Sequence, residues 1–534
     1  MRPAGRVGRP AGRAGNAGNA GNAGNAGNAG NAAGPSRSVT PAGRAAATLA
    51  GRPAAPAPRD SFADIRHPGR PATDFHLRFN YLALTHRMDA IKVGLLGFGT
   101  VGGGTYTVLA RNQEEISRRA GRGIAITRIA VRNPARAATR KAELDGALGA
   151  APGWDVRIGE DLRELVDDPS LDIVVETIGG TTVARDLVLR AIGNGKHVVT
   201  ANKALLAVHG TEIFQAASER GVMVAFEAAV AGGIPIIKAL REGLSANRIN
   251  WIAGIINGTT NYILSEMRDR GVDFASALAD AQRLGYAEAD PTFDIDGVDA
   301  AHKVALMSAL AFGVPVQFER AHVEGIRHLE AVDIRYAEEL GYRIKLLGLT
   351  RRTPAGIELR VHPTLVPAAR LLANVEGAMN AVAVSADAVG MTVYYGKGAG
   401  AEPTASAVVA DLVDVTRLHT ADPEQRVPHL AFQADRLSDT PILPIGDVRS
   451  SYYLRMRVAD ETGVLAHITR LLADADISID ALLQKASREG EGATDLILLT
   501  HLTREAAADQ AIAAIEALPT VVSKVTRLRM ESLD

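Results

Sequence analysis

The chain has 534 residues and a formal net charge of −1, with 47% hydrophobic and 22% charged residues. This balance is typical of soluble globular domains and gives no electrostatic reason to expect nucleic acid or a membrane surface as a partner. The sequence contains no cysteine, which excludes disulfides, thiolate metal sites and a cysteine nucleophile. No apolar run approaches the roughly 18–20 residues that span a bilayer. We therefore expect a cytoplasmic protein of about two to four domains.

Residues 1–87 differ from the rest of the chain. Six Gly-Asn-Ala triplets fill residues 15–32, and the whole segment holds 12 Arg and 3 Asp but no Lys or Glu. Such a composition offers too little apolar surface to offset the entropy lost on ordering, so a disordered, low-complexity extension is predicted. An Arg-rich, acid-poor N-terminus is also found in transit peptides, which leaves that alternative open.

A folded pattern begins at residue 88. Apolar segments typical of buried strands occur at residues 91–96, 124–131, 172–177 and 197–200, and helical stretches separate them. The first of these helices is expected to run to about Arg119. Strands that alternate with helices at this spacing predict an α/β fold with a doubly wound parallel sheet.

A glycine-rich motif directly follows the first strand and precedes a helix. It consists of Gly97, Phe98, Gly99, Thr100, Val101 and Gly102. In a dinucleotide fingerprint, the first glycine allows a tight turn, the second lets a pyrophosphate approach the backbone, and the third packs the helix on the strand. The helix N-terminus favours phosphate charge. This context predicts a Rossmann-type dinucleotide-binding domain over residues 88–222.

The end of the second strand bears on the choice of cofactor. It carries no Asp or Glu to hold a ribose 2′-hydroxyl and offers Arg132 and Arg136 instead. A 2′-phosphate is therefore more easily accommodated than excluded, so NADP is expected and NAD stays possible. The alternative is a solvated pair of surface arginines.

The sequence pattern divides the rest of the chain, from residue 223 onward, into further predicted domains. A strand is expected at 223–230 and a helix from Pro235, followed by a mixed region. The last 83 residues show the order strand, helix, strand, strand, helix, strand, which is typical of a separate small domain. We predict an α+β catalytic and dimerisation domain at 223–403, a helix at 404–418 that returns to the dinucleotide-binding domain, a linker at 419–450, and a βαββαβ domain at 451–534.

Three lysine and carboxylate features mark a candidate site. Lys203 lies just past the strand at 197–200, at the sheet edge where ligands of parallel sheets bind; a surface lysine is the alternative. Asp299 and Lys303 are spaced i, i+4 on a helix that is apolar nearly all round, which predicts a buried ion pair rather than a surface salt bridge. The acidic segment 288–296 precedes them. It lacks the 12-residue ligand pattern of a calcium loop.

A second glycine-rich turn, residues 396–400, enters the helix predicted at 404–418. It either closes over the cofactor or forms a tight connection, and the residues alone do not decide between these interpretations.

Together these segments resemble the homoserine dehydrogenase family over residues 91–420. The resemblance rests on long motifs in order, at 94–102, 199–203, 226–235, 254–262 and 285–291, leading to Asp299 and Lys303. The tail from about residue 452 resembles an ACT domain, through its strand-to-helix turn at 458–465.

The resemblance implies an NAD(P)-linked interconversion of L-aspartate 4-semialdehyde and L-homoserine, on the route to threonine, isoleucine and methionine. It implies that Lys303 is the proton donor, with Lys203 as the alternative, because the sequence cannot rank two lysines by geometry. The substrate carboxylates would be Glu288, Asp294 and Asp299. The cofactor would be contacted by the residues of the glycine motif, Arg132 and Lys203, and by Gly285, Gly398 and Gly400.

The resemblance also implies a sodium ion, bound through oxygens of Glu227, Val230, Gly232 and Ile234; the last three would use backbone carbonyls. It further implies an amino-acid effector at the ACT domain, with L-threonine as the expected feedback inhibitor, and a homodimer or homotetramer.

Two other functions compete with this interpretation. Aspartate-semialdehyde dehydrogenase needs a thiol nucleophile, and the chain has none. A non-catalytic regulator that senses a dinucleotide and an amino acid would suit the domain order, but it has no need of a buried acid beside a lysine. No segment resembles a kinase.

Overall fold

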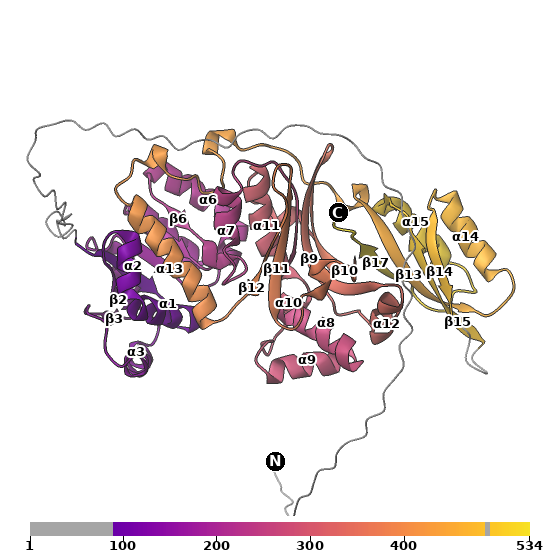
Figure 1. Cartoon of the computed structure of the whole chain (residues 1–534), viewed down its shortest axis with the longest axis horizontal. Helices are drawn as coiled ribbons and strands as arrows, with labels where there is room; N and C mark the ends of the chain where they lie inside the picture. Colours follow the sequence, from indigo (N-terminus) through magenta and orange to yellow (C-terminus); the bar gives the residue numbers. More distant parts are fainter. Residues whose placement is uncertain (1–88, 486–491) are drawn as a thin grey trace, which may run out of the picture. The chain divides into compact units, whose positions relative to one another are not determined.

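The computed structural model describes residues 89–485 and 492–534. The disorder predicted for residues 1–87 lies outside these residues. Within the described ranges, no helix is both long enough and apolar enough to cross a membrane. Two sheets organise the described chain, one of six strands and one of eleven (Figure 1).

The six-stranded sheet is parallel throughout and has the order β3-β2-β1-β4-β5-β6. Its strands are β1 (Ile91–Leu96), β2 (Ile124–Ala130), β3 (Arg157–Gly159), β4 (Ile173–Glu176), β5 (His197–Thr200) and β6 (Val224–Ala225). This order, which reverses at β1, confirms the predicted doubly wound sheet.

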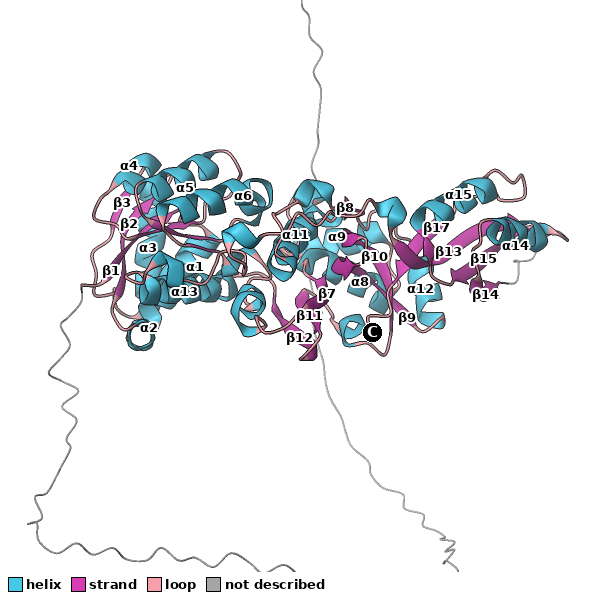
Figure 2. Cartoon of the chain, turned by 90° about the horizontal axis from the view of Figure 1, so that it is seen from above, coloured by secondary structure: helices cyan, strands magenta, loops and turns pink. Residues whose placement is uncertain are grey.

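Alternating side chains of the six-stranded sheet enter two different cores. Val93 and Leu95 pack on one face, whereas Leu96 packs on the other. Figure 2 shows α4, α5 and α6 on one side of this sheet and α1, α3 and α13 on the other. Their bounds are α1 (Thr100–Arg111), α3 (Pro134–Leu148), α4 (Leu162–Asp167), α5 (Val183–Gly193), α6 (Lys203–Arg220) and α13 (Ala401–Leu418).

The helix that follows the glycine motif is shorter than predicted. It ends at Arg111, and α2 (Gln113–Ala120) starts again after Asn112, whose φ of −107° and ψ of 21° are not helical. The single helix expected to reach about Arg119 is therefore two helices.

The prediction of a strand at 223–230 is wrong beyond Ala225. A 3₁₀ turn, η1 (Glu227–Ala229), follows β6. The reason is a side chain: the Glu227 carboxylate accepts hydrogen bonds from the backbone of Ile237 and Lys238, at 2.9 and 2.8 Å. The helix expected from Pro235 is likewise limited to α7 (Ile236–Lys238) and a π turn, η2 (Ala239–Gly243).

The eleven-stranded sheet has the order β12-β11-β7-β9-β10-β17-β13-β15-β14, with two short strands, β8 and β16, at its sides. The strands between residues 249 and 397 are β7 (Ile249–Ile255), β8 (His322–Val323), β9 (Tyr342–Thr353), β10 (Gly356–Pro367), β11 (Met379–Ala386) and β12 (Gly390–Lys397). The associated helices are α8 (Gly258–Arg270), α9 (Phe274–Arg283), α10 (Thr292–Ile295), α11 (Val298–Phe312) and α12 (Ala331–Glu339). Every residue of α11 from Asp299 onward is buried, as its apolar pattern predicts.

Helix α13, which includes the residues 404–418 predicted as a helix, packs beside the first sheet. Its residues Ala405, Val408 and Leu412 share a core with Tyr106 and Leu109 of α1. Both views place α13 alongside α1 (Figures 1 and 2). The dinucleotide-binding unit is therefore completed by a segment distant in sequence.

The C-terminal elements follow the predicted βαββαβ order. They are β13 (Arg449–Ala459), α14 (Val464–Asp474), β14 (Ile479–Gln484), β15 (Ala493–Thr500), β16 (Thr503–Arg504), α15 (Glu505–Glu516) and β17 (Thr526–Met530). The sequence did not indicate that β17 pairs with both β10 and β13, so that this unit shares a sheet with the central one. The predicted linker contains three 3₁₀ turns, η5 (Pro423–Gln425), η6 (Ala434–Arg436) and η7 (Ile445–Asp447). The exact domain boundaries stay predictions.

Candidate active site

Each of the three glycines of the fingerprint is glycine for a different structural reason. Gly97 has a φ of +93°, which favours glycine. A Cβ on Gly102 would lie 2.3 Å from the carbonyl oxygen of Gly97, so only glycine lets the helix approach the turn this closely. A Cβ on Gly99 would meet nothing within 4 Å, so this position opens toward the pocket beyond it.

A pocket of about 530 Å³ lies at this turn. It brings together residues from the ends of β1, β2 and β4, and from α3: Gly97, Phe98, Gly99, Val131, Arg132, Asn133, Arg136, Ala137, Arg140, Leu162, Thr177, Ile178, Gly179 and Val183. Of the predicted cofactor residues, Gly97, Phe98, Gly99 and Arg132 line it. Thr100, Val101 and Gly102 continue the same turn into α1.

Sequence reasoning missed Arg140, a third arginine of this pocket. Its Nε is buried and has no hydrogen-bond partner among the described residues. Its guanidinium lies over the first turns of α1, because a Cβ on Gly103 would come within 2.9 Å of Arg140 Nε. The signal was present in the spacing, since Arg132, Arg136 and Arg140 recur every four residues. An orphaned guanidinium N–H in a pocket of this kind suits a phosphate oxygen.

Glu176 connects the pocket to the start of α6. This carboxylate is fully buried at the end of β4 and accepts backbone hydrogen bonds from Ile178 and Gly179, both at 2.9 Å. It also accepts a 2.6 Å bond from the Thr200 hydroxyl. Asn202 then donates to the Gly180 carbonyl at 2.7 Å and caps α6. The strand end that lines the pocket is thereby tied to the residue before Lys203.

Two lysines meet on one buried carboxylate. Lys303 Nζ lies 2.7 Å from Asp299 Oδ2, and Lys203 Nζ lies 3.2 Å from Asp299 Oδ1. Lys303 also donates to the carbonyl oxygen of Ile256 at 2.6 Å. The exposed fractions of Asp299 and Lys303 are 4% and 8%, which confirms the predicted buried ion pair. The structure therefore brings together all three predicted residues.

Burial and charge move the pKa values of this cluster in different directions. Burial lowers the pKa of Lys303, and the neighbouring Asp299 only partly offsets this effect. Burial alone would raise the pKa of Asp299, but Lys303 and Lys203 hold it well below its usual range. The carboxylate is thus ionised while the buried ammonium is easier to deprotonate than a free lysine.

Asn257 is a second residue that sequence reasoning did not single out. Its amide donates to Asp294 at 2.7 Å and to Asp299 at 2.9 Å, while its carbonyl oxygen caps α8 through the backbone N–H of Thr260. Thr259 donates to the other Asp294 oxygen at 3.0 Å. Burial, together with Asp299, raises the pKa of Asp294. Asn at a helix N-cap directly after an apolar strand was the available signal.

Four predicted residues stay outside these contacts. Glu288 is exposed, and within the described part of the chain only its backbone carbonyl accepts a hydrogen bond, from Gln282. Gly285 is exposed after α9, with a φ of +78°. Gly398 packs against Asn380 and Gly232, and Gly400 starts α13. None of these four lines the pocket at the glycine turn, so their contacts with ligands stay predictions.

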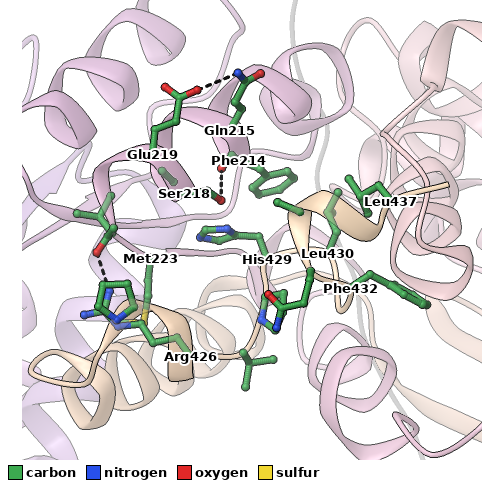
Figure 3. A pocket seen from close by; sticks show the side chains of 18 of the residues that line it. Phe214, Gln215, Ser218, Glu219, Met223, Arg426, His429, Leu430, Phe432 and Leu437 are labelled. Atoms are coloured by element: carbon green, nitrogen blue, oxygen red, sulfur yellow. Dashed lines mark hydrogen bonds between the residues drawn. The ribbon is translucent and has the colours of Figure 1, made fainter. Parts of the chain in front are cut away.

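A second pocket, of about 500 Å³, lies at the other end of α6 (Figure 3). Phe214 and Ser218 of α6 face His429 and Phe432 of the linker there. The pocket contains none of the predicted site residues, and the guanidinium of Arg426 in it donates to three backbone carbonyls. The glycine-turn pocket and the two-lysine cluster therefore form the candidate active site.

Three family models match the chain in the same order as these structural units. Residues 97–227 match the model for the homoserine dehydrogenase NAD-binding domain, residues 235–413 the model for homoserine dehydrogenase, and residues 452–520 the ACT domain. The homoserine dehydrogenase of Pseudomonas aeruginosa is 59% identical over 447 residues, which cover 84% of this chain and all of that one. The homoserine dehydrogenase of Neisseria gonorrhoeae is 57% identical with the same coverage.

The chain belongs to the homoserine dehydrogenase family. It is accordingly an oxidoreductase with a Rossmann-like NAD-binding domain, a catalytic domain and a C-terminal ACT domain. A solved homoserine dehydrogenase from Thiobacillus denitrificans is 65% identical, with a TM-score of 0.78, and the match covers 84% of this chain and 99% of that one. A hyperthermophilic archaeal homoserine dehydrogenase in complex with NADPH matches at 27% identity, with a TM-score of 0.52, over 62% of this chain and 99% of that one.

Proposed function

We propose that the chain interconverts L-aspartate 4-semialdehyde and L-homoserine with NADP(H), in the synthesis of threonine, methionine and isoleucine. The observation that carries this proposal is the placement of Lys203 and Lys303 on the single buried carboxylate of Asp299, with Asp294 held beside it by Asn257. Such a cluster offers a proton donor and carboxylates for a substrate ammonium group within one buried site.

Lys303 is the proposed proton donor. When the aldehyde is reduced, the bound nicotinamide supplies the hydride, and the carbonyl oxygen needs a proton. The Lys303 ammonium donates two of its three N–H groups to Asp299 and to the carbonyl oxygen of Ile256. The third N–H is left for the substrate oxygen. Because burial lowers the pKa of Lys303, the ammonium can release its proton to the oxygen and regain it from solvent. Asp299 holds the ammonium in place and Lys203 contacts the substrate from the cofactor side.

The pocket at the glycine turn fits NADP. Arg132, Arg136 and Arg140 supply positive charge, and no acidic residue among those described lines this pocket. The unpartnered Nε of Arg140 suits a phosphate oxygen. These residues would hold the phosphates of the dinucleotide, and Arg132 the 2′-phosphate, for which NAD has no equivalent.

The residues predicted to hold sodium also fit a hard cation. Ala231 has a φ of +55° and Gly232 a φ of +51°, and the carbonyl oxygens of Val230 and Gly232 accept no hydrogen bond from the described residues. The pKa of the nearby Asp411 is raised to about 8, by burial and then by the charge of Glu227, and a bound cation would favour the ionised form of these two buried carboxyl groups. Glu227, Val230, Gly232 and Ile234 would hold the ion and thereby order the turn. Replacing sodium by tetramethylammonium should then lower the melting temperature.

The ACT domain is the proposed site of feedback inhibition by L-threonine. Its strand-to-helix turn ends at Gly463, which has a φ of +91° directly before α14. Gly463→Val would force this turn out of shape and should abolish inhibition while uninhibited turnover persists. Inhibition of normal strength in that variant would place the effector elsewhere. Deleting residues 452–534 is a poorer test, because β17 pairs with β10 of the catalytic sheet.

A homodimer is proposed through the edge of the eleven-stranded sheet. Strand β12 ends this sheet, and Val389, Met391 and Tyr395 there have exposed fractions of 49–60%. Exposed large hydrophobic side chains at an edge strand, which is paired on one side only, are typical of an interface.

The direct test of the proposed function is the oxidation of L-homoserine by the purified chain, with NADP⁺ and with NAD⁺. We expect reduction of NADP⁺ that depends on L-homoserine. The absence of reduction with either cofactor would refute the proposal.

A further inference from the structure

A short segment packs directly against α10, the helix that carries Asp294. A Cβ on Gly325 would lie 2.2 Å from the carbonyl oxygen of Ile295 and 2.5 Å from Cα of Asp296, so the two backbones are in contact. The N–H of Ile326 donates to that same carbonyl at 2.8 Å. The position of α10 therefore depends on where residues 324–327 lie.

Arg327 adds a second attachment to α10. Its guanidinium makes two bonds to the Asp296 carboxylate, at 2.6 and 3.1 Å, and donates to the Thr292 hydroxyl at 3.1 Å. Both ends of α10 are thus connected to the same segment. Because Asp294 lies between these contacts and bonds to Asn257 and Thr259, a shift of the segment would move its carboxylate.

Glu324 fixes this segment to the ACT domain. Arg529 of β17 donates to both oxygens of Glu324, at 2.7 and 2.9 Å, in the bidentate geometry that makes such pairs strong. His322 also contacts the Glu324 carboxylate, at 2.8 Å. Burial alone would raise the pKa of Glu324, but His322 and Arg529 hold it well below its usual range. The pair is therefore an ion pair at working pH.

Arg529 is itself held by the ACT domain. It is 1% exposed and also bonds to Glu505 at the start of α15, with a 2.9 Å bond from Nε. Glu505 in turn accepts a 2.7 Å bond from the hydroxyl of Tyr452 on β13. Arg529 thus links Glu324 to β13 and α15, so the position of Glu324 depends on theirs.

We propose that Glu324 is a positioning residue for Asp294, and that through Arg529 it makes the position of this carboxylate depend on the ACT domain. The inference rests on the proposed role of Asp294 in substrate binding. It supplies a continuous series of contacts between the regulatory domain and the substrate side of the active site.

The test is the variant Glu324→Gln in the full chain, which keeps the side-chain size and leaves Arg529 paired with Glu505. We expect the KM for L-homoserine to rise about 3- to 30-fold, while kcat and the KM for NADP⁺ stay within roughly twofold. Combined with Asp294→Asn, the substitution should add little to the effect of Asp294→Asn alone, because both act through one carboxylate.

Asp333→Asn is the matched control. Asp333 of α12 is fully buried and accepts bonds from Arg455 at 2.6 and 3.0 Å and from Tyr453 at 2.9 Å, so it also joins the catalytic and ACT domains by an ion pair. It makes no hydrogen bond to α10 among the described residues. We expect it to lower the melting temperature without raising the KM for L-homoserine.

The possible outcomes distinguish a failure of the positioning role of Glu324 from a failure of the proposed substrate role of Asp294. Equal rises in KM for Glu324→Gln and Asp333→Asn, or full additivity with Asp294→Asn, would overturn the positioning role. A raised KM in Asp294→Asn with an unchanged KM in Glu324→Gln would also overturn it. An unchanged KM in Asp294→Asn would refute the proposed substrate role itself, and the positioning role with it.

Discussion

The cofactor pocket and the substrate cluster of this enzyme are built in opposite ways. The pocket lies at the ends of neighbouring parallel strands, where a Cβ on Gly99 or Gly179 would meet nothing within 4 Å and space is left for a ligand. The cluster is formed by charged side chains from α6, α10 and α11, which are brought together only by the folded chain. The cofactor pocket depends on the local shape of the backbone, whereas the substrate cluster depends on buried side-chain charges that neutralise one another.

This difference predicts that substitutions in the two regions will affect separate kinetic constants. Changes in the cluster should affect kcat and the KM for L-homoserine. Changes in the pocket should affect cofactor binding. Among the described residues, no hydrogen bond joins the arginines of the pocket to the cluster.

The largest effect is expected for Lys303→Ala. Without a positioned acid, kcat should fall about 10²–10⁴-fold. The control is Lys196→Ala, since Lys196 is also buried and also donates to backbone carbonyls, at 2.6 and 3.1 Å, but lies outside the cluster. A near-normal kcat in Lys303→Ala with a large loss in Lys203→Ala would reverse the roles assigned to the two lysines. Steady-state assays of the three variants check this prediction.

A smaller effect is expected for Arg132→Asp in the pocket. Losing a charge-assisted contact to the 2′-phosphate and adding a negative charge should raise the KM for NADP⁺ about 10- to 100-fold, and that for NAD⁺ far less. Arg118→Asp is the control, because this arginine on α2 is solvent-exposed and pairs only with Glu115 in the contacts described. Equal effects of Arg132→Asp on both cofactors would place it away from the 2′ position.

The smallest effect concerns stability and pH. The pKa of Glu324 is depressed in the folded state, so the native protein binds fewer protons at this group than the unfolded chain. The stabilisation is therefore present above the unfolded pKa of about 4.3 and is lost as pH falls below it. Melting temperatures at pH 7, 5 and 4 should show Glu324→Gln below the wild type at pH 7 and 5, with the gap narrowing at pH 4. A gap that widens toward low pH would contradict the ion pair with Arg529.

The same contrast explains what the sequence could predict. The glycine fingerprint and the parallel strands were evident because they depend on neighbours in the chain, and the i, i+4 spacing of Asp299 and Lys303 indicated their ion pair for the same reason. The contact of Lys203 with Asp299 joins α6 to α11, and no local pattern encodes it. The 3₁₀ turn at Glu227 was mistaken for a strand because its cause is a hydrogen bond to Ile237, ten residues away.

The role of Arg140 and the pairing of β17 could not be predicted from the sequence, for related reasons. Arg140 could be noticed from its spacing, but only the fold shows that its Nε is buried without a partner. The position of β17 between β10 and β13 depends on the pairing of segments far apart in sequence. The Glu324–Arg529 pair follows from that pairing.

Lys203 pairs with Asp299 of the cluster and is proposed to contact the cofactor as well. The measurement that tests the separation of the two regions most directly is therefore NADPH binding by the matched variants Lys203→Ala and Lys303→Ala. Fluorescence titration gives the Kd of NADPH without any need for turnover. Lys303→Ala should bind NADPH within roughly twofold of the wild type, whereas Lys203→Ala should bind it about 3- to 10-fold more weakly, since Lys203 alone is proposed to touch both ligands. If Lys303→Ala weakens NADPH binding as much as Lys203→Ala does, the cofactor pocket and the substrate cluster are not separate sites, and the assignment of Lys303 to the substrate oxygen is wrong.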